Sequence, residues 1–322
     1  MSEESNLLSK KDLIINVIIS VSVLVLGLIL LEMGFNLSFE SENETIRAIF
    51  EIITFLGEEE TFIVFLTISL LAIDMRFGKR LIVSFMISMF FNSFLKDVIK
   101  DPRPHGLEAE MGYGFPSGHT QGSTAFWGFT LYYKKNEADS KKQAGIISAI
   151  CTLLIIAVSI SRLIIGVHDL QDVVGGFLIG MLILDLYLLL APSVEKLSEK
   201  SLGLRIILGF IAAFSLWLVM ALLFPAGAEA VGQGGGILVA ASICFPLETK
   251  YIAYKPQDLP AKKKILAALV GVVFSMVGYL GLSEVFDLIP GPAWILRFVR
   301  YVILGVLLSL FVPWILKKIV KQ

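Results

Sequence analysis

The chain has 322 residues, of which 56% are hydrophobic and 17% are charged, and its formal net charge is −1. A soluble domain needs more polar surface than this composition supplies, so lipid must be the solvent for most of the chain. The net charge of −1 and the lack of a basic run interleaved with aromatic residues argue against nucleic acid as a partner, because binding to a phosphate backbone needs a local excess of Lys and Arg.

Apolar stretches recur along the whole chain and are separated by short polar breaks. Because a helix needs roughly 20 residues to cross a bilayer, the sequence predicts an all-α, polytopic membrane protein. Between the first two spans, apolar residues at helical spacing from Ile46 to Leu56 predict a further helix, lying either in the membrane interface or in a water-exposed loop. Ten spans are predicted, at residues 13–34, 61–75, 81–95, 119–133, 144–165, 171–191, 205–224, 234–247, 265–284 and 295–316.

The basic residues are distributed unevenly between the two sides of this topology. With the amino terminus inside, 20 of the 27 Lys and Arg residues fall on the inner side. Positively charged loops tend to stay cytoplasmic, so we expect both termini in the cytoplasm. The chain looks like a microbial plasma-membrane protein, so the plasma membrane is its expected location. Seven basic residues remain on the outer side: Arg47, Lys96, Lys100, Arg103, Arg162, Arg297 and Arg300.

Four of these outer basic residues lie in two segments that also contain all three histidines of the chain, His105, His119 and His168. Arg offers a planar fork of donors and Lys a point charge, and both suit a phosphate group. A pair of histidines can divide the roles of nucleophile and acid. The outer side is therefore the candidate active face. His105 and Glu108 lie between the first two of the three motifs described next, where either substrate selection or plain solvation would account for them.

Three motifs carry a resemblance to a known family. They are Lys96 followed after six residues by Arg103-Pro104, then Pro116-Ser117-Gly118-His119, then Ser161-Arg162 with His168 and Asp172. In this order and at this spacing they resemble the type-2 phosphatidic acid phosphatase (PAP2) superfamily. The resemblance implies a six-span lipid-phosphatase core over residues 1–192, with the active site where the motifs converge. Residues 193–322 would form an additional transmembrane region of about four spans.

The third motif places a histidine and a carboxylate four residues apart. On a helix, His168 and Asp172 would share a face, so the carboxylate can hold one imidazole nitrogen and leave the other free to attack. The resemblance likewise implies that His168 is the nucleophile and forms a phosphohistidine. It implies that His119 is the general acid, which then activates water.

The remaining motif residues are expected to bind the phosphate. Lys96, Arg103 and Arg162 would stabilise the negative charge of the transferring group, and Ser117 and the Gly118 backbone amide would add hydrogen bonds. No cluster of carboxylates or cysteines offers a site for a divalent metal, and the two cysteines lie in separate apolar runs. We therefore expect metal-independent catalysis with no cofactor.

The substrate class and the role of the carboxy-terminal spans stay open. A lipid phosphate or diphosphate of the polyprenyl or diacylglycerol type is preferred, and a sphingoid-base phosphate or a soluble phosphate ester also fits. A lipid transporter or scramblase with a phosphatase-like core is the alternative, although these spans hold few of the ionisable groups that coupled transport requires. A vanadate-dependent haloperoxidase shares the motifs but needs bound vanadate. The glycine-rich run from Gly232 to Gly236 predicts either close helix packing or a gap for lipid access.

Overall fold

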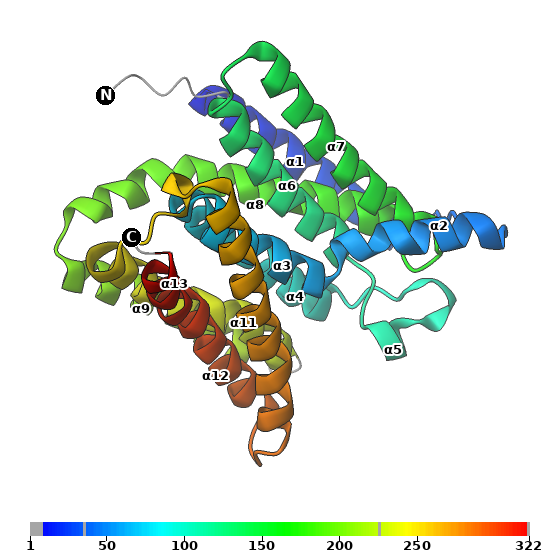
Figure 1. Cartoon of the computed structure of the whole chain (residues 1–322). Coiled ribbons are helices and arrows are strands. Elements are labelled where there is room, and N and C mark those ends of the chain that lie inside the picture. The colour runs from blue at the N-terminus through cyan, green and yellow to red at the C-terminus, as the bar shows by residue number, and fades with distance from the viewer. Residues whose placement is uncertain (1–8, 35–36, 225–226, 321–322) are drawn as a thin grey trace. The chain divides into compact units, whose positions relative to one another are not determined.

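The computed structural model describes residues 9–34, 37–224 and 227–320 (Figure 1). Within these ranges all regular structure is helical, as predicted, and eight helices are long and apolar enough to cross a membrane. The two other predicted spans also fall on helices. Residues 61–73 of the second predicted span lie on α3 (Glu59–Ile68) and the π turn η2 (Ser69–Ile73), and residues 119–133 lie on α6 (Gly118–Asn136).

The chain folds into two compact units, each built from two stretches of sequence. The first comprises residues 1–58 and 95–193, and the second comprises residues 59–94 and 194–322. The first unit contains α1 (Lys10–Glu32), α2 (Glu44–Thr54), the 3-10 turns η1 (Phe55–Gly57) and η3 (Pro104–Gly106), α5 (Glu108–Met111), α6, α7 (Lys141–Ile164) and α8 (Leu170–Lys196) up to residue 193. The predicted functional division near residue 192 stays a prediction.

The second unit contains most of α4 and the carboxy-terminal helices. Its elements are α3, η2, α4 (Met75–Ile99) up to residue 94, η4 (Leu197–Glu199), α9 (Leu202–Leu223), α10 (Ala228–Leu247), η6 (Glu248–Ile252), η7 (Pro256–Asp258), α11 (Ala261–Asp287), α12 (Ala293–Val306), η8 (Leu307–Phe311) and α13 (Val312–Ile319). The last turn of α4, from residue 95, belongs to the first unit.

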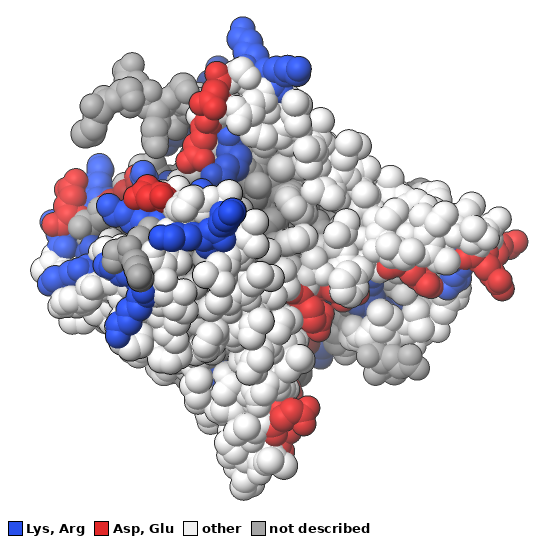
Figure 2. Space-filling model, viewed as in Figure 1, with Lys and Arg blue, Asp and Glu red and all other residues white. Residues whose placement is uncertain are grey.

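The outward faces of the long helices are apolar. Ile18 and Leu26 of α1 are exposed, as are Leu269 and Val277 of α11. Figure 2 shows broad surfaces without charge and a concentration of Lys and Arg in a limited part of the view. A helix surrounded by hydrocarbon satisfies its backbone polar groups internally and turns apolar side chains outward, so the protein is an integral membrane protein.

Glycines bring α6 and α8 close together in the first unit. A Cβ atom at Gly176 would lie 2.6 Å from the backbone oxygen of Ser117, and one at Gly180 would lie 2.8 Å from Cβ of Thr124. Small residues of this kind allow two helix backbones to approach. α6 also packs against α7, which in turn packs against α2. The amino-terminal ends of α6 and α8, which carry two of the three motifs, therefore lie side by side.

The glycine-rich run of α10 packs closely, which confirms the first of its two interpretations. A Cβ atom at Gly236 would lie 2.5 Å from the backbone oxygen of Phe298, and one at Gly235 would lie 2.6 Å from Cδ1 of Trp217. The rings of Trp217 and Phe298 stack with their centroids 3.6 Å apart. This run therefore serves the packing of α10 against α9 and α12.

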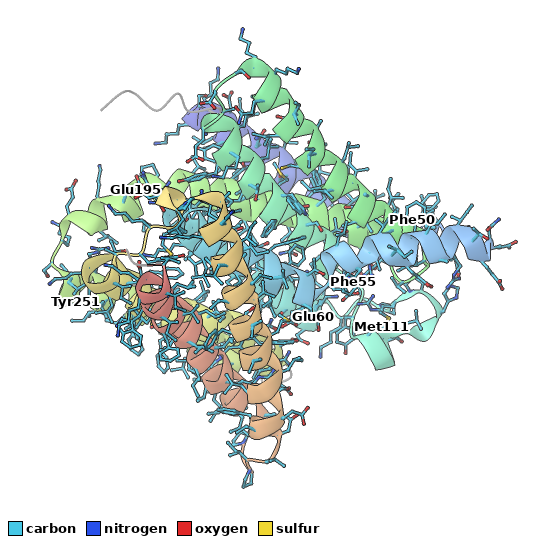
Figure 3. All side chains as sticks on the ribbon, in the orientation of Figure 1. Phe50, Phe55, Glu60, Met111, Glu195 and Tyr251 are labelled. Carbon is cyan, nitrogen blue, oxygen red and sulfur yellow. The ribbon has the colours of Figure 1, made fainter. Side chains whose placement is uncertain are left out.

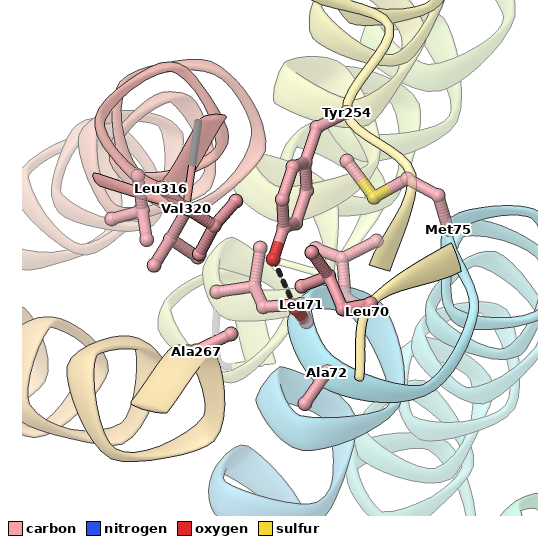
Figure 4. Close-up of a cluster of buried hydrophobic side chains, with 10 residues drawn as sticks. Leu70, Leu71, Ala72, Met75, Tyr254, Ala267, Leu316 and Val320 are labelled. Atoms are coloured by element: carbon pink, nitrogen blue, oxygen red, sulfur yellow. Dashed lines mark hydrogen bonds between the residues drawn. The ribbon is translucent and has the colours of Figure 1, made fainter. Parts of the chain in front are cut away.

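A hydrophobic cluster fills the second unit beside η2 (Figure 4). The Tyr254 hydroxyl reaches into this cluster and donates a hydrogen bond of 2.9 Å to the backbone oxygen of Leu71. A buried tyrosine hydroxyl needs such a partner. Leu70, Leu316 and the other apolar members then pack around the ring without leaving a polar group unpaired.

The break between the second and third predicted spans lies earlier than the sequence predicted. α4 begins at Met75, and Asp74 Oδ1 accepts a hydrogen bond of 2.6 Å from the backbone N–H of Phe77. This cap places Lys79 inside the helix, where its Nζ contacts Glu248 and donates to Thr249 Oγ1 at 2.7 Å. A buried charge is tolerated when it is paired in this way, so Lys79 does not need a loop.

Candidate active site

His168 lies two residues before the start of α8, and both of its ring nitrogens are engaged. Nδ1 is 2.8 Å from Oδ2 of Asp172, and Nε2 is 3.0 Å from Nη1 of Arg103. Because a guanidinium can only donate, Nε2 accepts with its lone pair and the proton of a neutral imidazole is on Nδ1, which faces Asp172. Burial, together with the positive charges of Arg103, Lys96 and Arg162, lowers the pKa of His168 well below its ordinary value of 6.5. The imidazole is therefore neutral and oriented at neutral pH, as a nucleophile requires.

Arg103 is fixed by the loop that carries it and by the segment before His168. Its Nε donates to the backbone oxygen of Gly112 at 2.6 Å and Nη2 donates to that of Met111, labelled in Figure 3, at 3.2 Å. Nη1 also donates to the backbone oxygen of Val167 at 2.8 Å. Burial lowers the pKa of Arg103 below its usual value, which still leaves a cation. A guanidinium anchored at several points is preorganised to meet an anion.

Two further cations come from the ends of long helices. Lys96 lies in the last turn of α4, where its Nζ contacts the backbone oxygen of Tyr113 and donates to that of Gly114 at 3.2 Å. Arg162 lies in the last turn of α7, and its Nη1 donates to Thr54 Oγ1 at 2.7 Å. Its Nε is buried and has no partner among the described residues. A buried donor without a partner costs free energy, which an incoming phosphate oxygen would recover.

The second motif forms the amino-terminal end of α6. Ser117 precedes the helix and donates its backbone N–H to the backbone oxygen of Asp172 at 3.0 Å, and α6 begins at Gly118. The first N–H groups of a helix have no partner within the helix and favour an anion. His119 therefore lies in the first turn of a helix whose positive end adjoins α8.

Glu58 and Thr54 belong to this site but lie outside all three motifs. Oε1 of Glu58 is 3.0 Å from Nε2 of His119, and this contact holds the pKa of Glu58 below its usual range. Gly57 packs against the same ring, since a Cβ atom there would lie 2.9 Å from Cδ2 of His119. The available signal for Glu58 was a run of three glutamates, Glu58 to Glu60, at the outer end of the second predicted span.

Several polar residues surround this centre. Asp101 interacts with Asp172, and burial raises the pKa of Asp101. Nε2 of His105 lies 2.8 Å from Oε2 of Glu40. Oε2 of Glu108 accepts a hydrogen bond of 3.2 Å from the backbone N–H of Arg103. Glu108 thus shapes the loop that holds Arg103, whereas His105 pairs with Glu40 away from His168.

All eight residues predicted for the site lie in the first unit, and the contacts above bring them together. A neutral, oriented imidazole beside three cations and a helix amino terminus suits the transfer of a phosphoryl group, whose negative charge spreads over its oxygens. Among the described residues, no group of three or more His, Cys, Asp and Glu side chains could hold a metal ion. Catalysis without a metal stays a prediction.

Comparison with known proteins is consistent with this geometry. The family model described as PAP2 superfamily matches residues 77–195, and a second model, PAP2 superfamily phosphatase, transmembrane extension, matches residues 232–321.

Three curated relatives show the range of similarity. Sphingosine-1-phosphate phosphatase 1 of Rattus norvegicus is 27% identical over 221 residues, which cover 60% of this chain and 47% of the relative. Phosphatidylglycerophosphatase B of Bacillus subtilis is 28% identical over 126 residues (38% of this chain and 62% of the relative). Dolichyldiphosphatase of Saccharomyces cerevisiae is 30% identical over 125 residues (35% and 51%). The chain thus spans about half the length of the rat protein. No solved structure matches it significantly.

Proposed function

Because the chain belongs to the PAP2 superfamily, we propose that it is a membrane phosphatase that removes phosphate from a lipid phosphate or diphosphate through a phosphohistidine, without a metal ion. The observation that carries this proposal is the state of His168. Asp172 holds Nδ1–H, and the lone pair of Nε2 faces Arg103, where an anionic phosphate would be bound.

In the first step, Nη1 of Arg103 gives up its hydrogen bond to Nε2 of His168 and donates to a phosphate oxygen instead. Nε2 then attacks the phosphorus atom, and the bond from phosphorus to the lipid oxygen breaks. His119 gives its proton to that oxygen, so that the product leaves as an alcohol or, from a diphosphate, as a monophosphate. The phosphorylated imidazole carries a positive charge, and the Asp172 carboxylate at 2.8 Å from Nδ1 stabilises it.

In the second step, water attacks the phosphohistidine. His119 has lost its proton in the first step and now takes one from the water, and the phosphorus–nitrogen bond breaks to return neutral His168 and inorganic phosphate. Arg103, Lys96 and Arg162 bind the phosphoryl oxygens in both steps, together with Ser117 and the backbone amide of Gly118.

The substrate is proposed to be a membrane lipid, approached from the outer side of the plasma membrane. The three relatives are named for phosphates on different apolar groups, namely sphingosine phosphate, phosphatidylglycerophosphate and dolichyl diphosphate. A polyprenyl or diacylglycerol chain remains our preference from the sequence, and a sphingoid-base phosphate joins it because of the first of these names.

The proposal is tested by measuring phosphate release from the full-length, detergent-purified protein in EDTA. The panel holds phosphatidic acid, phosphatidylglycerophosphate, a polyprenyl diphosphate, a sphingoid-base phosphate and a soluble sugar phosphate. We expect release from at least one lipid class without added metal. Release that stops in EDTA and returns with Mg²⁺ would contradict the mechanism, and no release from any lipid would contradict the function.

Replacing Glu58 by glutamine is expected to weaken His119 as an acid. The ionised carboxylate lies 3.0 Å from Nε2 and favours the protonated imidazole. Because its pKa is lowered, Glu58 stays ionised at neutral pH. Without that charge, His119 loses its proton at lower pH, so the basic limb of the pH profile of kcat should move to lower pH. At neutral pH, kcat should fall about 10- to 100-fold, because only part of the rate gain from general acid catalysis is lost.

The matched control for Glu58 is Glu44→Gln, at the exposed start of α2. It removes the same charge from the same segment without touching His119, and its pH profile should equal that of the wild type. Glu58→Asp should restore part of the activity. A Glu58→Gln variant with lower kcat but an unmoved basic limb would show that Glu58 acts on folding alone.

A further inference from the structure

An apolar groove runs along the first unit between α1 and the start of α8. Its volume is about 220 Å³, far above the roughly 15 Å³ that a single water molecule needs. Its lining is almost wholly hydrocarbon, which excludes water as the natural occupant. The lining residues are Val23, Leu24, Leu26, Gly27, Leu28 and Leu30 of α1, Leu37, Phe115, and Leu170, Gln171, Val174, Gly175 and Leu178 of α8.

One end of this groove adjoins the candidate active site. Leu37 is held at the start of α8 by two hydrogen bonds: its backbone oxygen accepts from the N–H of Leu170 at 2.9 Å, and its N–H donates to Oε1 of Gln171 at 3.2 Å. Asp172 directly follows Leu170 and Gln171 in the sequence, and His168 lies two residues before Leu170. The rim of the groove is thus built from the same turn of chain that carries the nucleophile.

Phe115 forms the wall between the groove and the site. It is 5% exposed, and its ring packs on Gly175, where a Cβ atom would lie 2.2 Å from Cε2 of the ring. The preceding residue, Gly114, accepts a hydrogen bond from Lys96 and lies against Asp172. Any molecule bound at Lys96 and His168 therefore has the groove beside it.

We propose that this groove binds the hydrocarbon chain of the substrate while its phosphate is held at His168. The inference rests on the proposed function. Along α1 the lining runs from Val23 to Leu30, which is roughly 10 Å at 1.5 Å per residue, so the groove accommodates the part of the chain nearest the headgroup. The rest of the chain extends into the surrounding lipid.

The groove contributes selectivity by positioning the hydrocarbon chain of the lipid. A hydrocarbon chain that leaves the bilayer for the groove exchanges one apolar environment for another, so hydrophobic transfer adds little. What the groove adds is a fixed chain direction, which presents the phosphorus atom to Nε2 of His168. Filling the groove should therefore reduce the preference for long chains over short ones without altering the phosphate chemistry.

Gly27 allows the groove to be filled without disturbing the helix packing. A Cβ atom at Gly27 would meet nothing within 4 Å, and neither would one at Gly145 in α7, which does not line the groove. For Gly27→Phe we expect the ratio of kcat/KM for a long-chain substrate to kcat/KM for its short-chain, water-soluble analogue to fall about tenfold, a loss equivalent to about 1.4 kcal/mol. Gly145→Phe, the matched control, should keep the wild-type ratio.

The measurement uses full-length protein in detergent, with the lipid class selected by the panel, its short-chain analogue and p-nitrophenyl phosphate. If the wild type cleaves the lipid and Gly27→Phe keeps the wild-type ratio, the groove proposal is wrong and the proposed function stands. If the wild type cleaves no lipid phosphate, it is the proposed function that fails.

A second measurement keeps the proposal testable if Gly27→Phe does not fold. In Gly27→Cys, a long-chain phosphonate that cannot be hydrolysed should slow alkylation of the new thiol, and a short-chain phosphonate should not. The native cysteines, Cys151 and Cys244, are buried. Equal alkylation rates with both phosphonates would show that only bulk lipid fills the groove.

Discussion

Replacement of His168 by alanine is expected to reduce kcat for the lipid substrate by about 10⁴-fold or more, the scale seen when a nucleophile is removed from a catalytic group that acts as a unit. Asp172 and Arg103 both contact this ring, at 2.8 Å and 3.0 Å, so its removal leaves both residues without the group that they orient. The measurement is phosphate release, together with trapping of a phosphoenzyme that resists alkali and is lost in acid. Wild-type protein should give this phosphoenzyme and His168→Ala should not.

The third histidine supplies the matched control. His105 pairs with Glu40 and its side chain is 60% exposed, so His105→Ala removes an imidazole from the same surface without touching the nucleophile. Its turnover should remain close to that of the wild type. Phosphate release by His168→Ala at the wild-type rate would instead mean that water attacks the lipid phosphate directly.

The site residues could be predicted because the three motifs, in their order and spacing, resemble one family. Spacing alone supported a single pair, His168 and Asp172, which lie four residues apart. It could not place Lys96, in the last turn of α4, beside Arg103, in the loop that follows. The helical class could be predicted because lipid leaves few alternatives to the helix.

Contacts over long sequence separations could not be predicted in this way. Glu58 reaches His119 from 61 residues away, and Thr54 reaches Arg162 over 108 residues. The first contact depends on the packing of η1 against α6 and the second on that of α2 against α7, and no short motif encodes either. Lys79 fell in the predicted break between the second and third spans, beside Arg76 and Arg80, and its partner Glu248 lies 169 residues away. A local sequence pattern cannot show that a buried charge is paired with a residue far along the chain.

Replacement of His119 by alanine should separate the two chemical steps. A lipid alkoxide is a poor leaving group and needs a proton, so turnover of the lipid should fall about 10²- to 10⁴-fold, the usual contribution of general acid catalysis. The nitrophenolate of p-nitrophenyl phosphate leaves without a proton, so His168 can still be phosphorylated. Hydrolysis of the phosphohistidine still needs a base for the attacking water, and it should remain slow.

With p-nitrophenyl phosphate, His119→Ala should therefore release one equivalent of nitrophenolate in a rapid burst and accumulate phosphoenzyme, which rapid mixing followed by quenching would detect. The double variant His119→Ala, His168→Ala should show no burst, because the nucleophile is gone. A single variant that loses the burst as well as turnover would indicate that His119 is needed to bind phosphate or to hold the site together. A single variant that turns over p-nitrophenyl phosphate at the wild-type rate would place the base elsewhere, and Glu58, 3.0 Å from the His119 ring, would be the first residue to test.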